Sequence, residues 1–308
     1  MKKISELRDG PVVKSRAPVI IKKSIIVIGA TICAIFFLLP TILTFTNSFM
    51  SATEIRANYG KVFETSDSGA KSYIGEMVKL KLIPDRVSVE QYKTVLFKSP
   101  DYLFKFWNSL IYSVPIALLQ IYFAMGASYA FARMRGKLKN VLFFVYTMIC
   151  LMPYQVTLVP NYLVSDWLNI INTRWAIWLP GIASPFAVYL LTKSIKRIPK
   201  ALYEAAKVDG ANEFTMFTKI CLPLCKGPMF SVGILIFIDY WNMVEQPLIL
   251  LQDDKLQPLS IFLSRINSGE IGLAFAVAVI YMIPCVLLFL YGEDYLVEGI
   301  TTQGGVKG

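Results

Sequence analysis

The chain has 308 residues, 55% of them hydrophobic, with a mean hydropathy of +0.54 and a formal net charge of +10. This is more apolar surface than a soluble domain can bury, so the composition predicts a membrane protein. The chain contains no histidine, which removes the usual general base, most zinc sites and the Ser–His or Cys–His nucleophiles of enzymes. We therefore expect no catalytic site, no metal and no cofactor.

Six apolar runs predict an all-α integral membrane protein with six transmembrane helices. In chain order they cover residues 25–46, 110–131, 141–163, 175–191, 229–251 and 271–291. A hydrocarbon core about 30 Å thick needs about 20 helical residues, and every run comes close to that length. The fourth run is the shortest, and we expect it to use flanking residues. The first run is too long for a cleavable signal peptide, and no small-residue cleavage pattern follows it.

The spacing of the runs divides the chain into three parts. An N-terminal segment (1–24) precedes the transmembrane domain (25–292), and a short tail (293–308) follows it. Two connections inside the domain are long enough to carry structure of their own, one at about 48–106 and the other at about 193–226.

Charge predicts the orientation of these parts. Lys and Arg are frequent in the N-terminal segment, after the second run and in 193–226, whereas the short loops on the other side hold only Arg174, Lys255 and Arg265. The positive-inside rule places both termini and 193–226 in the cytoplasm, and 48–106 outside. This asymmetry and the anionic lipid of the inner face account for the net charge. No basic face with stacking aromatics predicts a nucleic-acid partner.

Every predicted span contains at least one proline. These residues are Pro40, Pro115, Pro153, Pro180, Pro185, Pro247 and Pro284. Membrane helices tolerate proline because neighbouring helices and water satisfy the freed carbonyls. Kinked helices can also form a cavity whose walls rock between inward-facing and outward-facing states. The two interpretations stay open for any single proline, and the set as a whole favours a transport cavity.

The loop 193–226 contains a stretch, 204–223, that predicts two short helices joined at a glycine. Gly210 stands where a helix would stop in the left-handed conformation that only glycine adopts cheaply. Asn212 is placed to cap a second helix, and Pro223 is expected to end that helix near Leu222. Phe214, Phe217 and Cys221 would then share one face, since they lie at helical spacing.

The fifth run carries polar residues that are costly in hydrocarbon. Asp239 and Glu245 should face water or a protein interior, and Asn242 lies three residues from each of them, so all three would share one broad helical face. One interpretation is a polar lining for a sugar path, with Tyr240 or Trp241 stacking on a sugar ring. The other is a hydrogen-bonded cluster that holds helices or a partner subunit together.

Short sequence patterns carry a resemblance to a known family. Glu204, Ala205 and Ala206, then Asp209 and Gly210, then Ile220, Leu222 and Pro223 resemble, at every anchor and spacing, the EAA loop of permease subunits of ABC importers. Further short matches are similar to the smaller permease of maltose-type sugar-uptake systems. They are residues 129–133, Met152, Pro153, Pro160, Asn172, Thr173, Pro180, Ile198, Pro199, Ala211, Trp241, Asn242, Pro247, Leu248 and the tail 304–308. The resemblance covers about residues 105–308.

The resemblance implies the ABC importer permease fold, with 193–226 as a cytoplasmic coupling loop, in a bacterial plasma membrane. It further implies a second, larger permease, a cytoplasmic ATPase dimer and an extracytoplasmic solute-binding protein. Residues 204–210 would seat in a groove of the ATPase, with Ala205 and Ala206 allowing close approach and Glu204 available for a charge contact. No G-x-x-x-x-G-K-[ST] string is present, so another chain would hydrolyse ATP.

Other interpretations stay open beside this one. A secondary transporter would also have kinked spans with charges near the bilayer midplane, but it usually shows internal repeats. A membrane-embedded enzyme would have only carboxylate or lysine chemistry, and no pair is spaced for it. The solute of an ABC permease need not be a sugar, and the loop 193–226 could be an amphipathic connector lying on the membrane.

Overall fold

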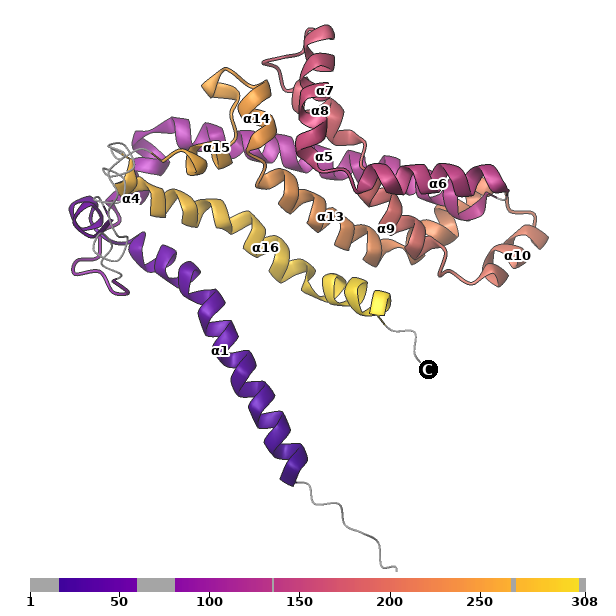
Figure 1. Ribbon diagram of the computed structural model, residues 1–308, viewed down its shortest axis with the longest axis horizontal. Helices are drawn as coiled ribbons and strands as arrows, with labels where there is room; N and C mark the ends of the chain where they lie inside the picture. The colour runs from indigo at the N-terminus through magenta and orange to yellow at the C-terminus, as the bar shows by residue number, and fades with distance from the viewer. Residues whose placement is uncertain (1–16, 60–80, 135, 267–269, 305–308) are drawn as a thin grey trace, which may run out of the picture.

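The computed structural model describes residues 17–59, 81–134, 136–266 and 270–304, and every regular element in these ranges is helical (Figure 1). The predicted all-α fold is confirmed. Most of the predicted N-terminal segment 1–24, residues 60–80 of the predicted long loop and the last residues of the tail lie outside the described residues.

The helices, in chain order, begin and end as follows. They are α1 (Ala17–Asn47), α4 (Glu90–Lys93), η1 (Thr94–Lys98), α5 (Pro100–Arg133), α6 (Lys137–Cys150), α7 (Tyr154–Trp167), α8 (Trp175–Ile182), α9 (Pro185–Ile195), α10 (Lys200–Val208), α11 (Glu213–Met216), η2 (Phe217–Cys221), α12 (Leu222–Leu224), α13 (Lys226–Trp241), α14 (Glu245–Leu250), η3 (Asp254–Leu256), α15 (Leu259–Ser264) and α16 (Ile271–Gly304).

A bundle of long helices forms the body of the molecule. α13 packs between α5 and α16, and α5 also packs against α8 and α9 (Figure 1). The main core lies where these helices meet, around Tyr112, Ile177, Leu191 and Trp241, all of which are fully buried. Gly292 lets α16 approach α13 closely, because a Cβ there would collide with Ile234 and Phe230. Small residues at helix crossings are typical of membrane bundles, where close backbone packing replaces the hydrophobic effect.

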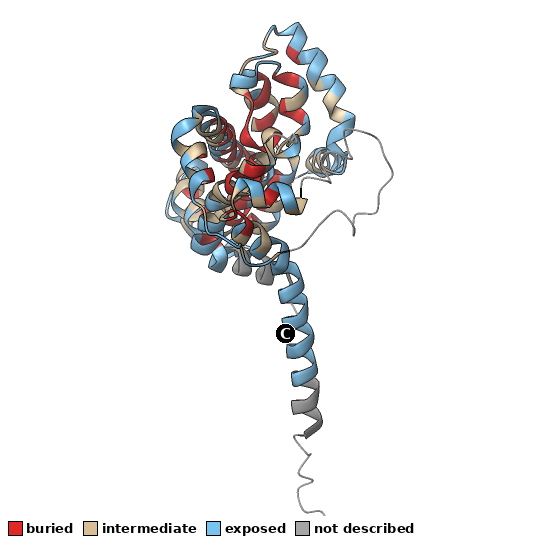
Figure 2. Ribbon diagram, turned by 90° about the vertical axis from the view of Figure 1, so that its left-hand side faces the viewer, coloured by how far each residue is buried: buried red, intermediate tan, exposed pale blue. Residues whose placement is uncertain are grey.

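The first span stands apart from this bundle. α1 is apolar over 23–47, and no part of its most apolar stretch is buried (Figures 1 and 2). α1 contacts α16, and at its C-terminal end the amide of Asn47 donates to the hydroxyl of Tyr59 and the hydroxyls of Ser48 and Tyr92 share a hydrogen bond, both 2.6 Å long. An apolar helix whose surface the rest of the described chain leaves uncovered needs lipid or another membrane protein around it.

Among the described residues, four helical segments are long and apolar enough to cross a membrane without a sharp bend. They are Lys23–Asn47, Pro100–Arg133, Trp175–Ile195 and Gly272–Tyr295. The fourth predicted run does extend beyond 191, to Ile195, as its short length suggested. α5 begins ten residues before the second run, inside the predicted loop 48–106, and α16 continues past the predicted start of the tail at 293. Hydropathy marks only the part of a helix that hydrocarbon surrounds, so it misses polar extensions at both ends.

The third run, 141–163, is not one continuous helix. α6 and α7 meet at a bend of 97°, and each has 14 residues, about 21 Å of helix against a hydrocarbon core of about 30 Å. Pro153 explains the break, since it cannot donate a backbone hydrogen bond and it disfavours a helical conformation at Met152. The pair forms a broken span or a re-entrant segment.

The fifth run, 229–251, is also broken, so its prediction as a single helix is wrong. α13 ends at Trp241, and Asn242–Val244 separates it from the short α14. Pro247 accounts for the interruption, because within a continuous helix its ring would clash with the carbonyl of Met243. As the third residue of α14 it lacks only an N–H that a first turn leaves unpaired anyway. The segment Glu213–Leu224 precedes α13 at a bend of 71°. Six spans result only when each bent pair is counted as one.

Candidate functional site

Local chemistry shapes the turn between α10 and α11. Gly210 has a φ of +80°, the left-handed conformation predicted for it. The N–H of Ala211 donates to the carbonyl of Ala206 (2.9 Å) and that of Gly210 to Lys207 (3.1 Å), the pattern that closes a helix at a left-handed glycine. Asn212 then caps α11, since its side-chain oxygen accepts from the N–H of Thr215 at 2.8 Å. Both predicted local features, the turn and the cap, are confirmed.

α10 presents almost all of its surface to the outside. Tyr203 is its one buried residue, 4% exposed. Glu204, Ala205 and Asp209 are exposed, and Val208 is 88% exposed. Figure 1 shows α10 at one end of the molecule, opposite the end that carries α4 and α15. A short helix anchored by one side chain, with a free face of small, acidic and apolar residues, is suited to docking against another protein.

The second helix of this loop continues further than predicted. A π turn, Phe217–Cys221, follows α11, and the helix runs on to Leu224 instead of ending near Leu222. The wider turn leaves Pro223 in the first turn of a new α-helical segment, where its missing N–H is tolerated. The extra residue in the turn also rotates the faces. Phe214 is therefore exposed while Cys221 is buried, so the predicted common face is wrong.

The remaining loop anchors lie along this second helix. Ile220 and Leu222 are half-buried, and Pro223 is exposed. Cys221 and Cys225 are both buried and free of any disulfide. After the turn, Leu222 packs against the main core, which includes Cys221 and Cys225, whereas Glu204, Ala205, Asp209 and Gly210 before it remain exposed.

The polar residues of the fifth run meet at the break between α13 and α14. Asp239 and Tyr240 come from the last turn of α13, Asn242 from the break and Glu245 from the start of α14. They line a cavity of about 430 Å³, together with Tyr154, Gln155, Met243, Val244 and Gln246. Glu245 accepts a hydrogen bond from the amide of Gln155 at 3.2 Å. The predicted common helical face of Asp239, Asn242 and Glu245 is wrong, because a helix break separates them, but all three line this one cavity.

The two aromatic residues of this segment have different surroundings. Trp241 has no exposed surface and stacks between Phe237 and Tyr281, with ring centroids 5.5 and 5.0 Å apart. Its indole N–H donates to the carbonyl of Tyr281 at 3.2 Å. Trp241 is therefore a core residue here and does not line the cavity. Tyr240 does line it, and its hydroxyl accepts from the amide of Gln120 at 3.3 Å.

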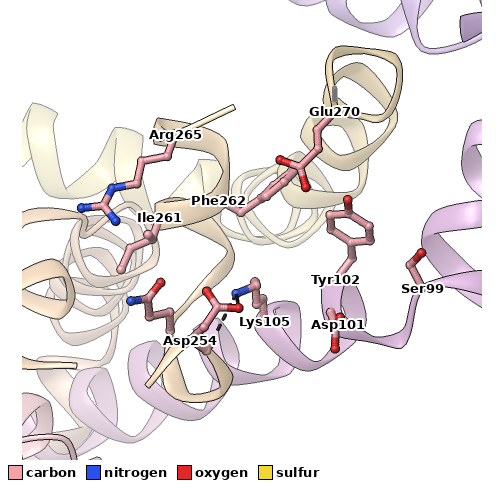
Figure 3. A pocket seen from close by; sticks show the side chains of 10 residues that line it. Ser99, Asp101, Tyr102, Lys105, Asp254, Ile261, Phe262, Arg265 and Glu270 are labelled. Carbon is pink, nitrogen blue, oxygen red and sulfur yellow. Dashed lines mark hydrogen bonds and ion pairs between the residues drawn. The ribbon is translucent and has the colours of Figure 1, made fainter. Parts of the chain in front are cut away.

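A charged pocket that the sequence did not indicate lies at the α4 and α15 end. It has a volume of about 330 Å³, and its side chains come from the start of α5 and from the segment 254–270 (Figure 3). Lys105 crosses it to pair with Asp254, at 2.6 Å between Nζ and Oδ2. These partners are 149 residues apart in sequence, so no local pattern could reveal them. The only indication of this pocket in the sequence is that the charged residue Lys105 lies shortly before the second predicted span, 110–131.

A bundle of apolar helices with a polar cavity at a helix break is the architecture of a membrane transport protein. Comparison with known proteins gives the family. Residues 94–301 match the family described as "Binding-protein-dependent transport system inner membrane component". The chain belongs to this family, which confirms the predicted resemblance and identifies it as a multi-pass inner-membrane protein.

Individual relatives agree with this assignment. The arabinooligosaccharides transport system permease protein AraQ of Halalkalibacterium halodurans is 30% identical over 230 residues, which cover 73% of this chain and 81% of the relative. The melibiose/raffinose/stachyose import permease protein MelC of Bacillus subtilis is 33% identical over 209 residues, 66% and 75% of the two chains. A chain of a bacterial ABC transporter involved in the import of the acidic polysaccharide alginate shares the fold, with a TM-score of 0.72 at 20% identity and coverage of 93% and 99%.

Proposed function

We propose that this chain is one of two permease subunits of an ATP-driven importer for a sugar or oligosaccharide. With a second permease it forms the membrane pathway, an extracytoplasmic binding protein delivers the solute, and a separate ATPase dimer hydrolyses ATP. The family membership and the sugar-transport relatives support this proposal. A self-contained secondary transporter fits less well, because members of this family are components of binding-protein-dependent systems.

The proposed contact with the ATPase is at the α10–α11 turn. Glu204, Ala205, Val208 and Asp209 form a free face at one end of the bundle, and Gly210 sets the angle between the two helices. The N-terminal end of α1 and the C-terminal end of α16 both point away from the α4 end (Figure 1). This arrangement and the excess of Lys and Arg near α10 support a cytoplasmic position for the turn and for both termini.

The proposed solute path includes the cavity at the α13–α14 break. Carboxylate oxygens of Asp239 and Glu245 can accept hydrogen bonds from sugar hydroxyls, Asn242 can donate and accept, and Tyr240 offers an aromatic ring for stacking on a sugar face. The hydrogen bond between Glu245 and Gln155 also ties α14 to α7, so a packing role for Glu245 is the competing interpretation.

Purification of the chain in its membrane complex tests the proposed assembly. The expected result is co-elution of an ATPase and a second permease in stoichiometric amounts, with ATP hydrolysis stimulated by a loaded binding protein. Recovery of the chain alone, from a membrane in which it supports uptake, would contradict the importer proposal and favour a transporter that works without partners.

A second candidate solute class follows from the charge of the cavity. Two of its nine lining residues are acidic and none is basic, so the half of the path built by this chain also suits a cationic solute. Competition against uptake of the native solute separates the two classes. Inhibition by neutral oligosaccharides and not by quaternary ammonium compounds supports sugar import, and the reverse pattern supports the cationic class.

A further inference from the structure

Tyr129 and Arg133, near the end of α5, both bind the side chain of Glu213, the first residue of α11. The hydroxyl of Tyr129 donates to one carboxylate oxygen of Glu213 at 2.7 Å, and the guanidinium of Arg133 donates to the other at 3.3 Å. Tyr129 and Arg133 lie four residues apart and so project from one side of α5. The Glu213 carboxylate therefore links the turn after Gly210 to α5, although Glu213 and Arg133 are 80 residues apart in the sequence.

The same two α5 residues also contact the helices on either side of the turn. The Arg133 guanidinium lies 4.4 Å from the ring centroid of Tyr203, the buried anchor of α10. The ring of Tyr129 packs against Phe217 of η2, with centroids 5.2 Å apart. α5 thus holds α10, α11 and η2 through one cluster, which we call the α5 clamp (Tyr129, Arg133, Tyr203, Glu213 and Phe217).

The clamp is stronger than its ion pair alone. The Glu213 side chain is 63% exposed and that of Arg133 is 29% exposed, and pairs this open contribute little by themselves. The aromatic rings fix the guanidinium in place, which lowers the entropy lost when it binds the carboxylate. The hydrogen bond from Tyr129, assisted by Arg133, lowers the pKa of Glu213, so the carboxylate is charged at neutral pH.

α5 connects this clamp to the wall of the polar cavity. Between Gln120 and Arg133 the helix contains no proline, and Tyr129 lies nine positions after Gln120, a rise of about 14 Å along the helix. The amide of Gln120, which is buried, donates to the carbonyl of Gly181 and to the hydroxyl of Tyr240, a cavity residue. A shift of α5 along its axis would therefore move a hydrogen-bond partner of Tyr240.

We propose that the α5 clamp makes α5 move together with the α10–α11 turn, so that motion of the turn reaches the cavity. Tyr129, Arg133 and Glu213 are positioning residues in this scheme, since none of them lines the cavity. The scheme rests on the proposed function for the source of the motion, an ATPase docked on α10. The mechanical link itself concerns only contacts within this chain.

Uptake per ATP hydrolysed, measured in the full complex in liposomes, tests the link. Glu213→Gln should retain the ATPase and its hydrolysis but lower solute uptake per ATP by about fivefold, since a charge-assisted hydrogen bond is much stronger than a neutral one. Arg133→Lys keeps the positive charge but loses the planar guanidinium, so it should lower uptake per ATP less than Glu213→Gln does. Glu293→Gln, an exposed carboxylate on α16, serves as the matched control and should behave like the wild type. Proportional loss of uptake and hydrolysis in Glu213→Gln, or unchanged uptake per ATP in that variant, would overturn the proposal.

Hydrogen exchange separates this test from the proposed function. In the purified full chain, with or without its partner subunits, Glu213→Gln and the milder Tyr129→Phe should speed amide exchange in 209–215 by about fivefold and leave α13 protected. This readout does not require an ATPase. Unchanged exchange in both variants would refute the clamp even in a functional importer, whereas faster exchange in a chain that recruits no ATPase would keep the clamp and reject the importer.

Discussion

Gly210 shows how a single backbone conformation shapes the loop. Its φ is +80°, and a Cβ added there would meet no heavy atom within 4 Å. Substitution is therefore penalised by the backbone alone and not by a clash. Gly136 has the same character, with a φ of +118° and open space around it, but it lies in the α5–α6 turn.

This pair of glycines allows a matched prediction. Gly210→Val should destabilise the turn by about 1–2 kcal/mol, because a β-branched residue is strongly disfavoured at positive φ. We expect an inserted protein that no longer retains an ATPase, whereas Gly210→Asn should keep part of the binding. Co-purification of the ATPase is the measurement, and Gly136→Val is the control. Equal ATPase recovery in Gly210→Val and the wild type would show that the turn is not the docking element.

The carboxylates of the cavity give a second prediction. If Asp239 and Glu245 contact the solute, Asp239→Asn and Glu245→Gln should alter transport and leave the yield of the complex unchanged. If they hold helices together, each change should weaken assembly by about 1 kcal/mol or less. Complex yield and uptake rate are compared for each variant. A loss of yield in proportion to the loss of uptake would assign these residues to packing.

At the scale of elements, two breaks between helices form the polar cavity. The α6–α7 bend and the α13–α14 break both lie beside prolines, and both contribute residues to the one cavity. In the structure the α13–α14 break, and not a common helical face, brings Asp239, Asn242 and Glu245 into one cavity with Gln155. Discontinuous helices with polar breaks are the usual solution for solute sites inside membranes.

The junction of α5 and α11 has a defined pH dependence. The pKa of Glu213 is lowered from 4.5, first by the hydrogen bond from Tyr129 and further by Arg133. The stabilisation of the α5–α11 junction by the Glu213 carboxylate is therefore fully present above pH 4.5, and it is lost as the pH falls through the lowered pKa that Glu213 has in the folded protein. A spin label on Val208→Cys should show unchanged mobility from pH 8 to 6 and higher mobility only below pH 4.5. In a Glu213→Gln background the low-pH change should disappear. A change near pH 7 would contradict this assignment.

At the scale of the whole molecule, the two ends of the bundle differ. One end carries α10, in a segment rich in Lys and Arg, and the other carries α4, α15 and the charged pocket around Lys105 and Asp254 (Figures 1 and 3). α1 lies apart, with its apolar surface uncovered. The described part of the chain thus presents polar groups at both ends and an uncovered apolar helix at its side, which are the surfaces that the proposed place between a binding protein and an ATPase requires.

Sidedness labelling tests this arrangement. Val208→Cys on α10 should react with a membrane-impermeant thiol reagent only after the cytoplasmic face is opened, whereas Ile83→Cys, 76% exposed at the other end, should react in intact cells. The native Cys221 and Cys225 are buried and should stay unlabelled in both conditions. Labelling of Val208→Cys in intact cells would place α10 outside and exclude contact with a cytoplasmic ATPase.

The sequence by itself determined what depends on neighbouring residues. Apolar length predicted the membrane spans, because the bilayer requires about 20 residues of helix. Gly210 and Asn212 predicted their turn and cap, because a left-handed glycine and an N-cap side chain act within four residues. The anchors of the loop, closely spaced in sequence, predicted the family.

Only the tertiary structure decided which distant groups meet. Hydropathy cannot show that a run such as 229–251 bends, because a broken helix is as apolar as a straight one. Hydropathy also cannot predict three contacts between residues that are 80 to 149 positions apart in the sequence. These contacts are Gln155 with Glu245, Lys105 with Asp254 and Arg133 with Glu213. Burial separated Trp241 from Tyr240 in the same way, since adjacent helical residues point in different directions and only packing decides which one faces the cavity.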